Sequence, residues 1–153
     1  WIFYTERNYN SGDFGIVEWV FGDNYCGNLG PTNNDVSSLR YAGRQNNWKE
    51  DAITLYGLTV FSGNAHLDLI DSSDVLMPSV QSIIISGERD WTVYSLPNFA
   101  GIEHCLVPEA GMYVGFFPNL SLLGINSVRS YRKGCFSDKK IRSGQHGVVM
   151  DRE

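Results

Sequence analysis

The stretch from Trp91 to Gly101, WTVYSLPNFAG, constrains the fold more than any other part of the chain. Its first half alternates between two faces with the two-residue period of a β-strand. Pro97 fixes φ, and the Asn that follows tolerates a left-handed backbone, so the middle of the stretch is typical of a turn. Phe99 then returns towards Tyr94, and Gly101 allows a conformation that a Cβ would oppose. The stretch predicts a tight hairpin closed by its own aromatic residues.

The same spacing of aromatic residues and glycine occurs in two other places, which predicts a repeated unit. It recurs fully at Tyr56, Phe61 and Gly63, and with one additional residue before the glycine at Tyr4, Tyr9 and Gly12. Each unit is also expected to end in a strand that begins with serine, at Ser38-Leu39-Arg40, Ser82-Ile83-Ile84 and Ser127-Val128-Arg129. A hairpin, a crossing strand, a loop and a closing strand make four strands per unit, which is a Greek key.

Composition agrees with an all-β fold that has no long helices. The 153 residues include 13% aromatic residues and 16 glycines, and no segment sustains the periodicity of a long helix. No apolar run approaches the roughly 18 residues that a membrane-spanning helix needs. The chain is long enough to bury a sizeable core.

Charge is distributed unevenly along the chain. Residues 1–128 carry 14 acidic and 5 basic residues, whereas residues 129–153 carry 7 basic and 3 acidic residues. The acidic body disfavours nucleic acid as a partner and suits cations. The basic C-terminal segment is expected to be a solvated tail, with contact to an anionic membrane or an acidic partner as the alternative.

The three hairpins resemble the signature of the βγ-crystallin family, in which two aromatic residues five positions apart are followed by a glycine. The resemblance covers about residues 1–132. It implies a Greek-key β-sandwich of βγ-crystallin type, with two Greek keys in each domain. A Trp shortly before the first aromatic residue, as at Trp1 and Trp91, resembles the second type of family motif, and the unit at 52–87 resembles the first type.

This resemblance predicts the domain organisation. Residues 52–132 are expected to form a two-motif domain, and residues 44–51 a polar linker in which Trp48 packs. Residues 1–43 then form a lone Greek key, completed by the basic segment 133–153, by another chain or by an N-terminal neighbour that has been removed. The alternative pairing, of the first unit with the second, would leave the third unit alone. A homodimer, or another protein bound through the unpaired Greek key, is therefore an expected partner, because an unpaired unit exposes an apolar face.

One loop matches the calcium motif of the family, which reads Asn/Asp–Asn/Asp–x–x–Ser/Thr–Ser before the closing strand. By the resemblance, the Ser37 hydroxyl, the backbone carbonyls of Asp35 and Glu6, and a side chain of Asn33 or Asn34 would bind Ca²⁺. Calcium prefers six to eight oxygen ligands of these kinds. Outside the repeat context, the same residues would be expected simply to form a turn.

The corresponding loops of the other two units depart from this motif. Aligned on the predicted closing serines, residues 77–82 (MPSVQS) place Gln81 at the hydroxyl position, and residues 122–127 (LLGINS) place Asn126 there. The chain is therefore expected to hold one intact and two degraded calcium loops.

Cysteines and histidines give little indication of catalysis. Cys26, Cys105 and Cys135 allow one disulfide and one free thiol, and no zinc spacing is present. The three histidines are scattered, and Asp68, Asp71 and Asp74 are expected to be a solvated acidic loop rather than a cation site. The chain is therefore not expected to be an enzyme.

Two functional hypotheses follow. The first is a non-enzymatic structural or calcium-binding protein. The second is a secreted interaction module, a toxin, defence or adhesion factor acting on a membrane, glycan or protein. The second hypothesis is motivated by the absence of an initiator Met, the odd number of motifs, the sequon at Asn119 and the basic end, although a sequon is expected by chance in a chain of this length.

Overall fold

The computed structural model describes residues 1–20 and 26–143. Part of the loop after β2, the last residues of the basic segment and His146 lie outside these ranges. Within them the chain is almost entirely β-structure, so the predicted fold class is confirmed. The strands are β1 (Ile2–Tyr4), β2 (Val17–Trp19), β3 (Ser38–Arg40), β4 (Ala52–Tyr56), β5 (Ala65–Asp68), β6 (Ser82–Ser86), β7 (Trp91–Leu96), β8 (Ala100–Val107), β9 (Val114–Phe117), β10 (Ser130–Lys133) and β11 (Lys140–Arg142). Two short 3-10 segments, η1 (Arg7–Asn10) and η2 (Ser121–Leu123), complete the elements, and neither is long and apolar enough to cross a membrane.

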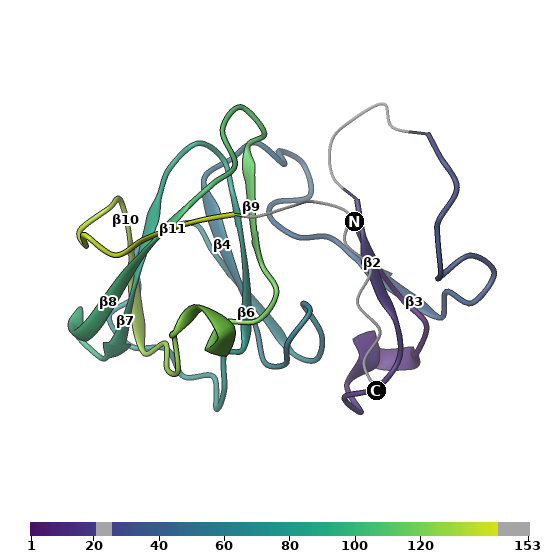
Figure 1. Cartoon of the computed structure of the whole chain (residues 1–153), viewed down its shortest axis with the longest axis horizontal. Coiled ribbons are helices and arrows are strands. Elements are labelled where there is room, and N and C mark those ends of the chain that lie inside the picture. Colours follow the sequence, from purple (N-terminus) through teal and green to yellow (C-terminus); the bar gives the residue numbers. More distant parts are fainter. Residues whose placement is uncertain (21–25, 144–153) are drawn as a thin grey trace.

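The strands form three sheets (Figure 1). Their orders are β2-β1-β3, β5-β4-β6-β9 and β10-β7-β8-β11. Each sheet is built on one predicted unit, and we call residues 1–43, 52–87 and 91–133 units one, two and three. Every strand pair is antiparallel except β8 with β11.

Units two and three exchange strands. The third strand of unit three, β9, pairs with β6 in the sheet of unit two. In return, the loop after β5 pairs with β10: Ser72 and Tyr131 exchange two backbone hydrogen bonds of 2.9 and 3.0 Å, and the Val75 amide donates to the Arg129 carbonyl at 2.7 Å. The sequence predicts a loop over residues 108–126, so the strand β9 within it is a correction.

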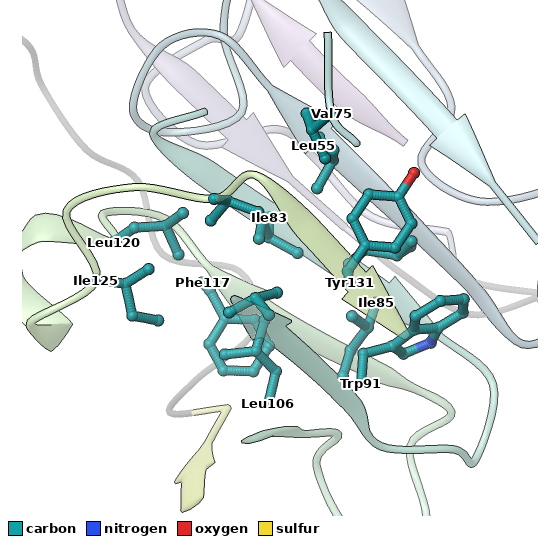
Figure 2. Close-up of a cluster of buried hydrophobic side chains, with 13 residues drawn as sticks. Leu55, Val75, Ile83, Ile85, Trp91, Leu106, Phe117, Leu120, Ile125 and Tyr131 are labelled. Atoms are coloured by element: carbon teal, nitrogen blue, oxygen red, sulfur yellow. The ribbon is translucent and has the colours of Figure 1, made fainter. Parts of the chain in front are cut away.

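The core between these two sheets is built from aliphatic and aromatic side chains (Figure 2). Inward-facing residues of β4 and β6 meet Trp91 and Val93 of β7 and Tyr131 of β10. Trp91 is fully buried there. Burying side chains of this size stabilises a fold by about 1.5–3 kcal/mol each, so this core dominates the stability of units two and three.

Unit one packs on the opposite face of the unit-two sheet. A second buried cluster joins Ile2, Tyr4, Val17 and Trp19 of unit one to the outward face of unit two and to β9, through Tyr56, Val60, Phe61, Ile84, Val114 and Phe116. Trp19 and Phe61 meet edge to face, with ring centroids 4.9 Å apart. The unit-two sheet is thus covered on both faces. We call the contact between units one and two the seam.

The linker and the basic segment attach to the main body. Trp48 of the linker packs edge to face against Tyr113, with ring centroids 6.1 Å apart, so it is a packing anchor as expected. After β10, a disulfide between Cys105 and Cys135 ties the chain to β8, and β11 adds to the edge of β8. The described part of the basic segment therefore joins the sheet of unit three rather than that of unit one.

Candidate functional site

The three hairpins share one backbone conformation. In each, the returning aromatic residue and the residue before it both have left-handed φ angles, at Asn8 and Tyr9 (53° and 58°), Val60 and Phe61 (53° and 58°), and Asn98 and Phe99 (58° and 58°). The two aromatic rings of each hairpin pack edge to face, with centroids 5.7, 5.5 and 5.8 Å apart. Left-handed φ angles are costly for residues other than glycine, so the surrounding contacts must hold these hairpins in place.

A serine at the start of the closing strand holds each hairpin. Ser38 Oγ donates to the Glu6 carbonyl at 2.6 Å and accepts from the Tyr9 amide at 3.1 Å. Ser82 makes the same pair of bonds with the Leu58 carbonyl and the Phe61 amide, at 2.6 and 2.9 Å. One hydroxyl thereby joins both arms of a folded hairpin to the strand that closes the unit.

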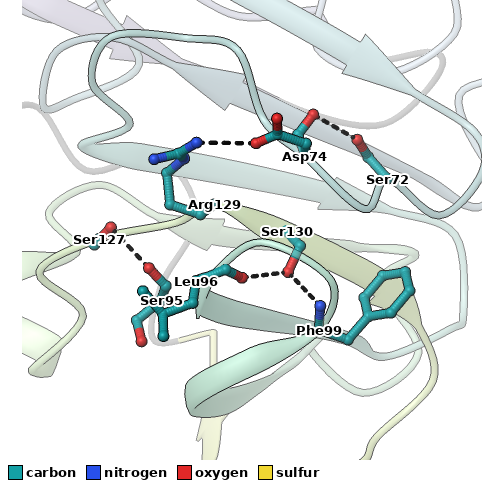
Figure 3. Close-up of polar contacts among 8 residues, drawn as sticks. All are labelled: Ser72, Asp74, Ser95, Leu96, Phe99, Ser127, Arg129 and Ser130. Carbon is teal, nitrogen blue, oxygen red and sulfur yellow. Dashed lines mark hydrogen bonds and ion pairs between the residues drawn. The ribbon is translucent and has the colours of Figure 1, made fainter.

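In unit three this serine is Ser130 and not the predicted Ser127. Ser130 Oγ donates to the Leu96 carbonyl at 2.7 Å and accepts from the Phe99 amide at 3.0 Å (Figure 3). Ser127 makes a different bond, from its hydroxyl to the Ser95 carbonyl at 3.2 Å. Ser127 was predicted because a serine followed by a β-branched residue matches the other closing strands, but the true closing serine lies 31 positions after Phe99, compared with 29 after Tyr9 in unit one.

The hairpin glycine of unit one also differs from the prediction. Gly63 and Gly101 lie two residues before the partner of the first aromatic residue in the hairpin ladder. Tyr4 pairs with Val17, so the equivalent glycine is Gly15 and not Gly12. All three equivalent glycines have positive φ, of 97° at Gly15, 72° at Gly63 and 83° at Gly101. The insertion in this hairpin is therefore four residues long.

The predicted calcium residues of unit one lie in an exposed turn and beside the hairpin. The Asn33 amide donates to the Gly30 carbonyl and the Asp35 amide to the Thr32 carbonyl, both at 3.0 Å, and Asn34 has a left-handed φ of 70°. Asn33, Asn34, Asp35 and Ser37 are all exposed. Within residues 1–20 and 26–143 their side chains make no hydrogen bond, so their oxygens are available to a ligand.

The structure brings Ser37 and Glu6 to the same end of the hairpin. The Ser37 amide donates to the Tyr4 carbonyl at 2.8 Å, and the next residue, Ser38, bonds the Glu6 carbonyl. A carbonyl oxygen has a second lone pair, so Glu6 can still accept a ligand. With Asn33, Asn34 and Asp35 these two residues present oxygens of the kinds that a hard cation prefers, and one oxygen from each of the five residues would be fewer than the six to eight that calcium takes.

The equivalent positions of the other units do not offer a hydroxyl. The Gln81 amide donates to the Tyr56 carbonyl at 2.9 Å, and the Arg129 amide donates to the Tyr94 carbonyl at 2.8 Å. The Ser37 amide makes the equivalent bond to the Tyr4 carbonyl in unit one. The Gln81 side chain donates a hydrogen bond to Ser79 Oγ, and Arg129 forms an ion pair of 2.9 Å with Asp74 (Figure 3). The predicted Asn126 is not at this position. Gln81 and Arg129 line the same cleft, of about 310 Å³, where the positive charge of Arg129 disfavours a cation.

The remaining candidates for chemistry have structural partners. Asp68 accepts a hydrogen bond from the Tyr131 hydroxyl, Asp71 accepts one from the Lys133 amide at 2.8 Å, and Asp74 pairs with Arg129. These carboxylates attach the end of β5 and the loop after it to residues 129–133 of unit three. Burial, and then the Lys139 charge, lower the pKa of His104, which has no nucleophile beside it because Cys105 is in a disulfide.

Among the described residues, one group of three metal-type ligands meets within 4.8 Å, at Asp90, Cys105 and Cys135. The two sulfurs are joined in the disulfide, and a metal would need them as thiolates. The third cysteine, Cys26, is exposed and free. One disulfide and one free thiol is the arrangement that the cysteine count allowed.

Comparisons with known proteins concern the fold. No family model matches the chain, and no curated protein matches it. A βγ-crystallin structure from an archaeon is similar over 54% of this chain and 96% of its own, at 19% identity and a TM-score of 0.47. A βγ-crystallin from Ciona intestinalis is similar over 54% and 98%, at 25% identity and 0.46. The fifth crystallin domain of the non-lens protein Absent in melanoma 1 is similar over 57% and 91%, at 26% identity and 0.47.

The chain has a βγ-crystallin-type fold. Its own geometry defines this class: three hairpins with paired left-handed residues, a serine that closes each of them, and two Greek keys that exchange strands. The resemblance inferred from the hairpin spacing is confirmed at the level of the fold.

Proposed function

We propose that the chain is a non-enzymatic structural protein of βγ-crystallin type that binds Ca²⁺ at the loop of unit one. The observation that supports this most is the identity of the residue directly before the closing serine in each unit. This position holds a hydroxyl at Ser37, an amide at Gln81 and a guanidinium at Arg129. Of the three positions, that of unit one alone carries a hydroxyl, and the exposed side-chain oxygens of Asn33, Asn34 and Asp35 lie in the same loop. The ligands are Asn33, Asn34, Asp35, Ser37 and Glu6.

Calorimetric titration of the metal-free chain with CaCl₂ tests the proposal directly. We expect one site, and a melting temperature that rises with calcium because the ligand binds the folded state. Ser37→Ala should weaken binding at least tenfold. Gln81→Ala is the matched control, since it alters the equivalent position of unit two, and it should leave binding unchanged. A chain that gives neither heat nor a thermal shift would contradict the calcium assignment.

A secreted interaction module is the second candidate, and the disulfide favours it. Bonds such as Cys105–Cys135 persist in oxidising compartments. Lys139, Lys140 and Arg142 add exposed positive charge near β11. Flotation with phosphatidylserine vesicles tests a membrane role, with Lys139→Glu/Lys140→Glu as the comparison. Equal flotation of both proteins, or none, would count against it.

A further inference from the structure

A pocket of about 230 Å³ opens beside the seam, where the linker leads from unit one to unit two. Its base is formed by Trp19, Ile84 and Phe116, which are buried and come from β2, β6 and β9. Tyr41, which follows β3, and Trp48 of the linker line its more exposed part. All three units and the linker therefore contribute to one pocket, and pockets that bind small molecules often lie at such junctions. We call it the seam pocket.

Aromatic side chains are the commonest kind in the lining of the seam pocket. Trp48 meets Tyr113 edge to face, with ring centroids 6.1 Å apart. Trp19 is tilted against Phe116, with centroids 6.0 Å apart, and Tyr41 adds a further ring. Rings prefer offset and edge-to-face contacts with other rings, so a lining of this kind favours a flat aromatic ligand over a branched or aliphatic one.

The charges around the seam pocket favour an uncharged ligand. None of the described residues that line it is charged. Lys49 is not part of the lining, but its Nζ lies 5.0 Å from the ring centroid of Trp48 and 4.8 Å from that of Tyr113. These two rings thus already attract one cation, whose charge disfavours a second. An anion would lose its hydration against the apolar lining, which is costly.

The polar groups and the volume of the seam pocket limit the ligand further. Apart from the aromatic residues, the polar residues of the described lining are Gln45 and Ser86. Ser86 Oγ already donates to the Glu50 carbonyl at 2.9 Å, whereas the Gln45 side chain is exposed and makes no hydrogen bond with the described residues. A cavity of about 150 Å³ accommodates benzene, and pockets for drug-sized molecules begin at about 300 Å³. The seam pocket, at about 230 Å³, therefore suits one or two fused rings with a single polar group.

We propose that the seam pocket binds a small, uncharged aromatic molecule of one or two rings. The ring system packs against Trp19, Trp48 and Tyr113, and its polar group meets the carboxamide of Gln45, which can both donate and accept a hydrogen bond. The pocket shares no residue with the loop proposed for calcium, so this inference does not depend on calcium binding.

Titration of the full chain with indole tests the proposal, because indole has two fused rings, no charge and one N–H donor. Calorimetry measures the affinity, and the tryptophan indole N–H signals in ¹⁵N–¹H NMR spectra locate the site. Trp91 is an internal control, since it is buried in the other core, between units two and three. We expect saturable binding of one indole per chain, with a dissociation constant below about 1 mM. The signals of Trp19 and Trp48 should shift, and that of Trp91 should not.

Two variants change the seam pocket in different ways. Trp48→Ala removes a ring from its exposed part, and Ala42→Leu narrows it without removing a ring, since Ala42 is a half-buried residue of the lining. Each should weaken indole binding by about tenfold or more, because each removes ring contacts or the space for them. Phe14→Ala, which removes an exposed aromatic residue of unit one outside the lining, is the matched control and should leave binding unchanged. Melting temperatures show that each variant is folded.

Tryptamine and indole-3-acetate carry the same rings with a positive and a negative charge, and each should bind more weakly than indole. Equal or tighter binding of either would overturn the assignment to an uncharged ligand. The site itself would be overturned if indole did not bind saturably, or if it shifted the Trp91 signal as much as that of Trp19. Unchanged binding by folded Trp48→Ala and Ala42→Leu would overturn it equally.

Discussion

The guanidinium of Arg40 in unit one donates to the backbone carbonyl of Phe61 in unit two at 2.6 Å. It also donates to the Gly63 carbonyl at 2.7 Å and to the Tyr4 hydroxyl at 2.8 Å. The residue two positions after the closing serine therefore connects the hairpins of two units. Unit three places Arg132 at the same position, where it bonds the Tyr94 hydroxyl at 2.8 Å and lies over the Phe136 ring. Unit two has Ile84 there, buried in the seam.

Removing the seam arginine should destabilise the protein more than removing its counterpart. Arg40→Met deletes three hydrogen bonds from a charged donor, and hydrogen bonds to charged groups contribute about 1.5–3 kcal/mol each before compensation. We expect the free energy of unfolding to fall by about 2–4 kcal/mol. Arg132→Met, the matched control, removes one such bond and a ring contact, and should cost about 1–2 kcal/mol. Urea unfolding followed by tryptophan fluorescence measures both, and equal losses would show that Arg40 does not stabilise the seam.

The hairpins were predictable from the sequence because their chemistry is local. Two aromatic residues, a turn and a glycine within eleven residues determine how such a segment folds. The seam was not predictable in this way. Tyr56, Phe61 and Ile84 alternate with core residues that face unit three, and a strand that is buried on both faces does not show which neighbour lies on which side. No local sequence pattern indicated the hydrogen bonds that Arg40 makes across the seam.

The errors at Gly12 and Ser127 have a common physical cause. Spacing along the chain locates a residue only where the intervening loop has constant length, and the register of a sheet is determined by pairing rather than by counting. The calcium loop proposed for unit one could be selected from the sequence because Asn33, Asn34, Asp35 and Ser37 lie within five residues, and its binding of calcium stays a prediction. The Arg129–Asp74 ion pair joins residues 55 positions apart, and no sequence pattern connected them.

Gly15 gives a direct test of the corrected hairpin register. A Cβ at this position would lie 2.8 Å from Glu6 Cγ and 2.9 Å from Thr5 Oγ1, and the φ of 97° is unfavourable for other residues. Gly15→Ala should therefore lower the free energy of unfolding by about 1–3 kcal/mol. A Cβ at Gly12 meets only the ring of Phe14, which is 56% exposed and can turn away, so Gly12→Ala should cost less than about 0.5 kcal/mol. The reverse order would restore the original assignment of Gly12.

The unequal covering of the units predicts unequal costs of truncation. Ile83→Ala opens a cavity in the core between units two and three, and should destabilise the protein by about 2–4 kcal/mol. Leu39→Ala alters the equivalent position of unit one, where the side chain is 46% exposed, and should cost less than about 1 kcal/mol. Thermal and urea unfolding of the two variants measure the difference. Similar losses would mean that the Leu39 side chain is covered in solution.

The Cys105–Cys135 disulfide should be a major source of stability for unit three. It joins residues 30 positions apart, and restricting an unfolded chain by a loop of this length is worth about 3.5 kcal/mol in the chain-entropy model. Cys105→Ala/Cys135→Ala should lower the free energy of unfolding by about 2–4 kcal/mol and increase hydrogen exchange in β11. Cys26→Ser serves as control and should have no effect, since Cys26 is exposed and free. Unchanged stability on reduction would show that β11 is held by its ladder alone.

The buried tyrosine of the seam predicts how stability falls at alkaline pH. Burial, and then the neighbouring Tyr4, raise the pKa of Tyr56 above its ordinary value of 10.0, while Arg40 acts in the opposite direction with a smaller effect. A raised folded-state pKa means that the unfolded chain loses its proton first, so this contribution to stability is complete below pH 10 and decreases above it. Up to the raised pKa the loss approaches about 1.4 kcal/mol per pH unit for one group. Urea unfolding between pH 8 and 11.5, in a Cys26→Ser background that prevents thiol exchange, should show a shallower decline for Tyr56→Phe than for the parent. Parallel declines would mean that Tyr56 ionises as readily in the folded protein as in the unfolded chain, and that the seam admits water.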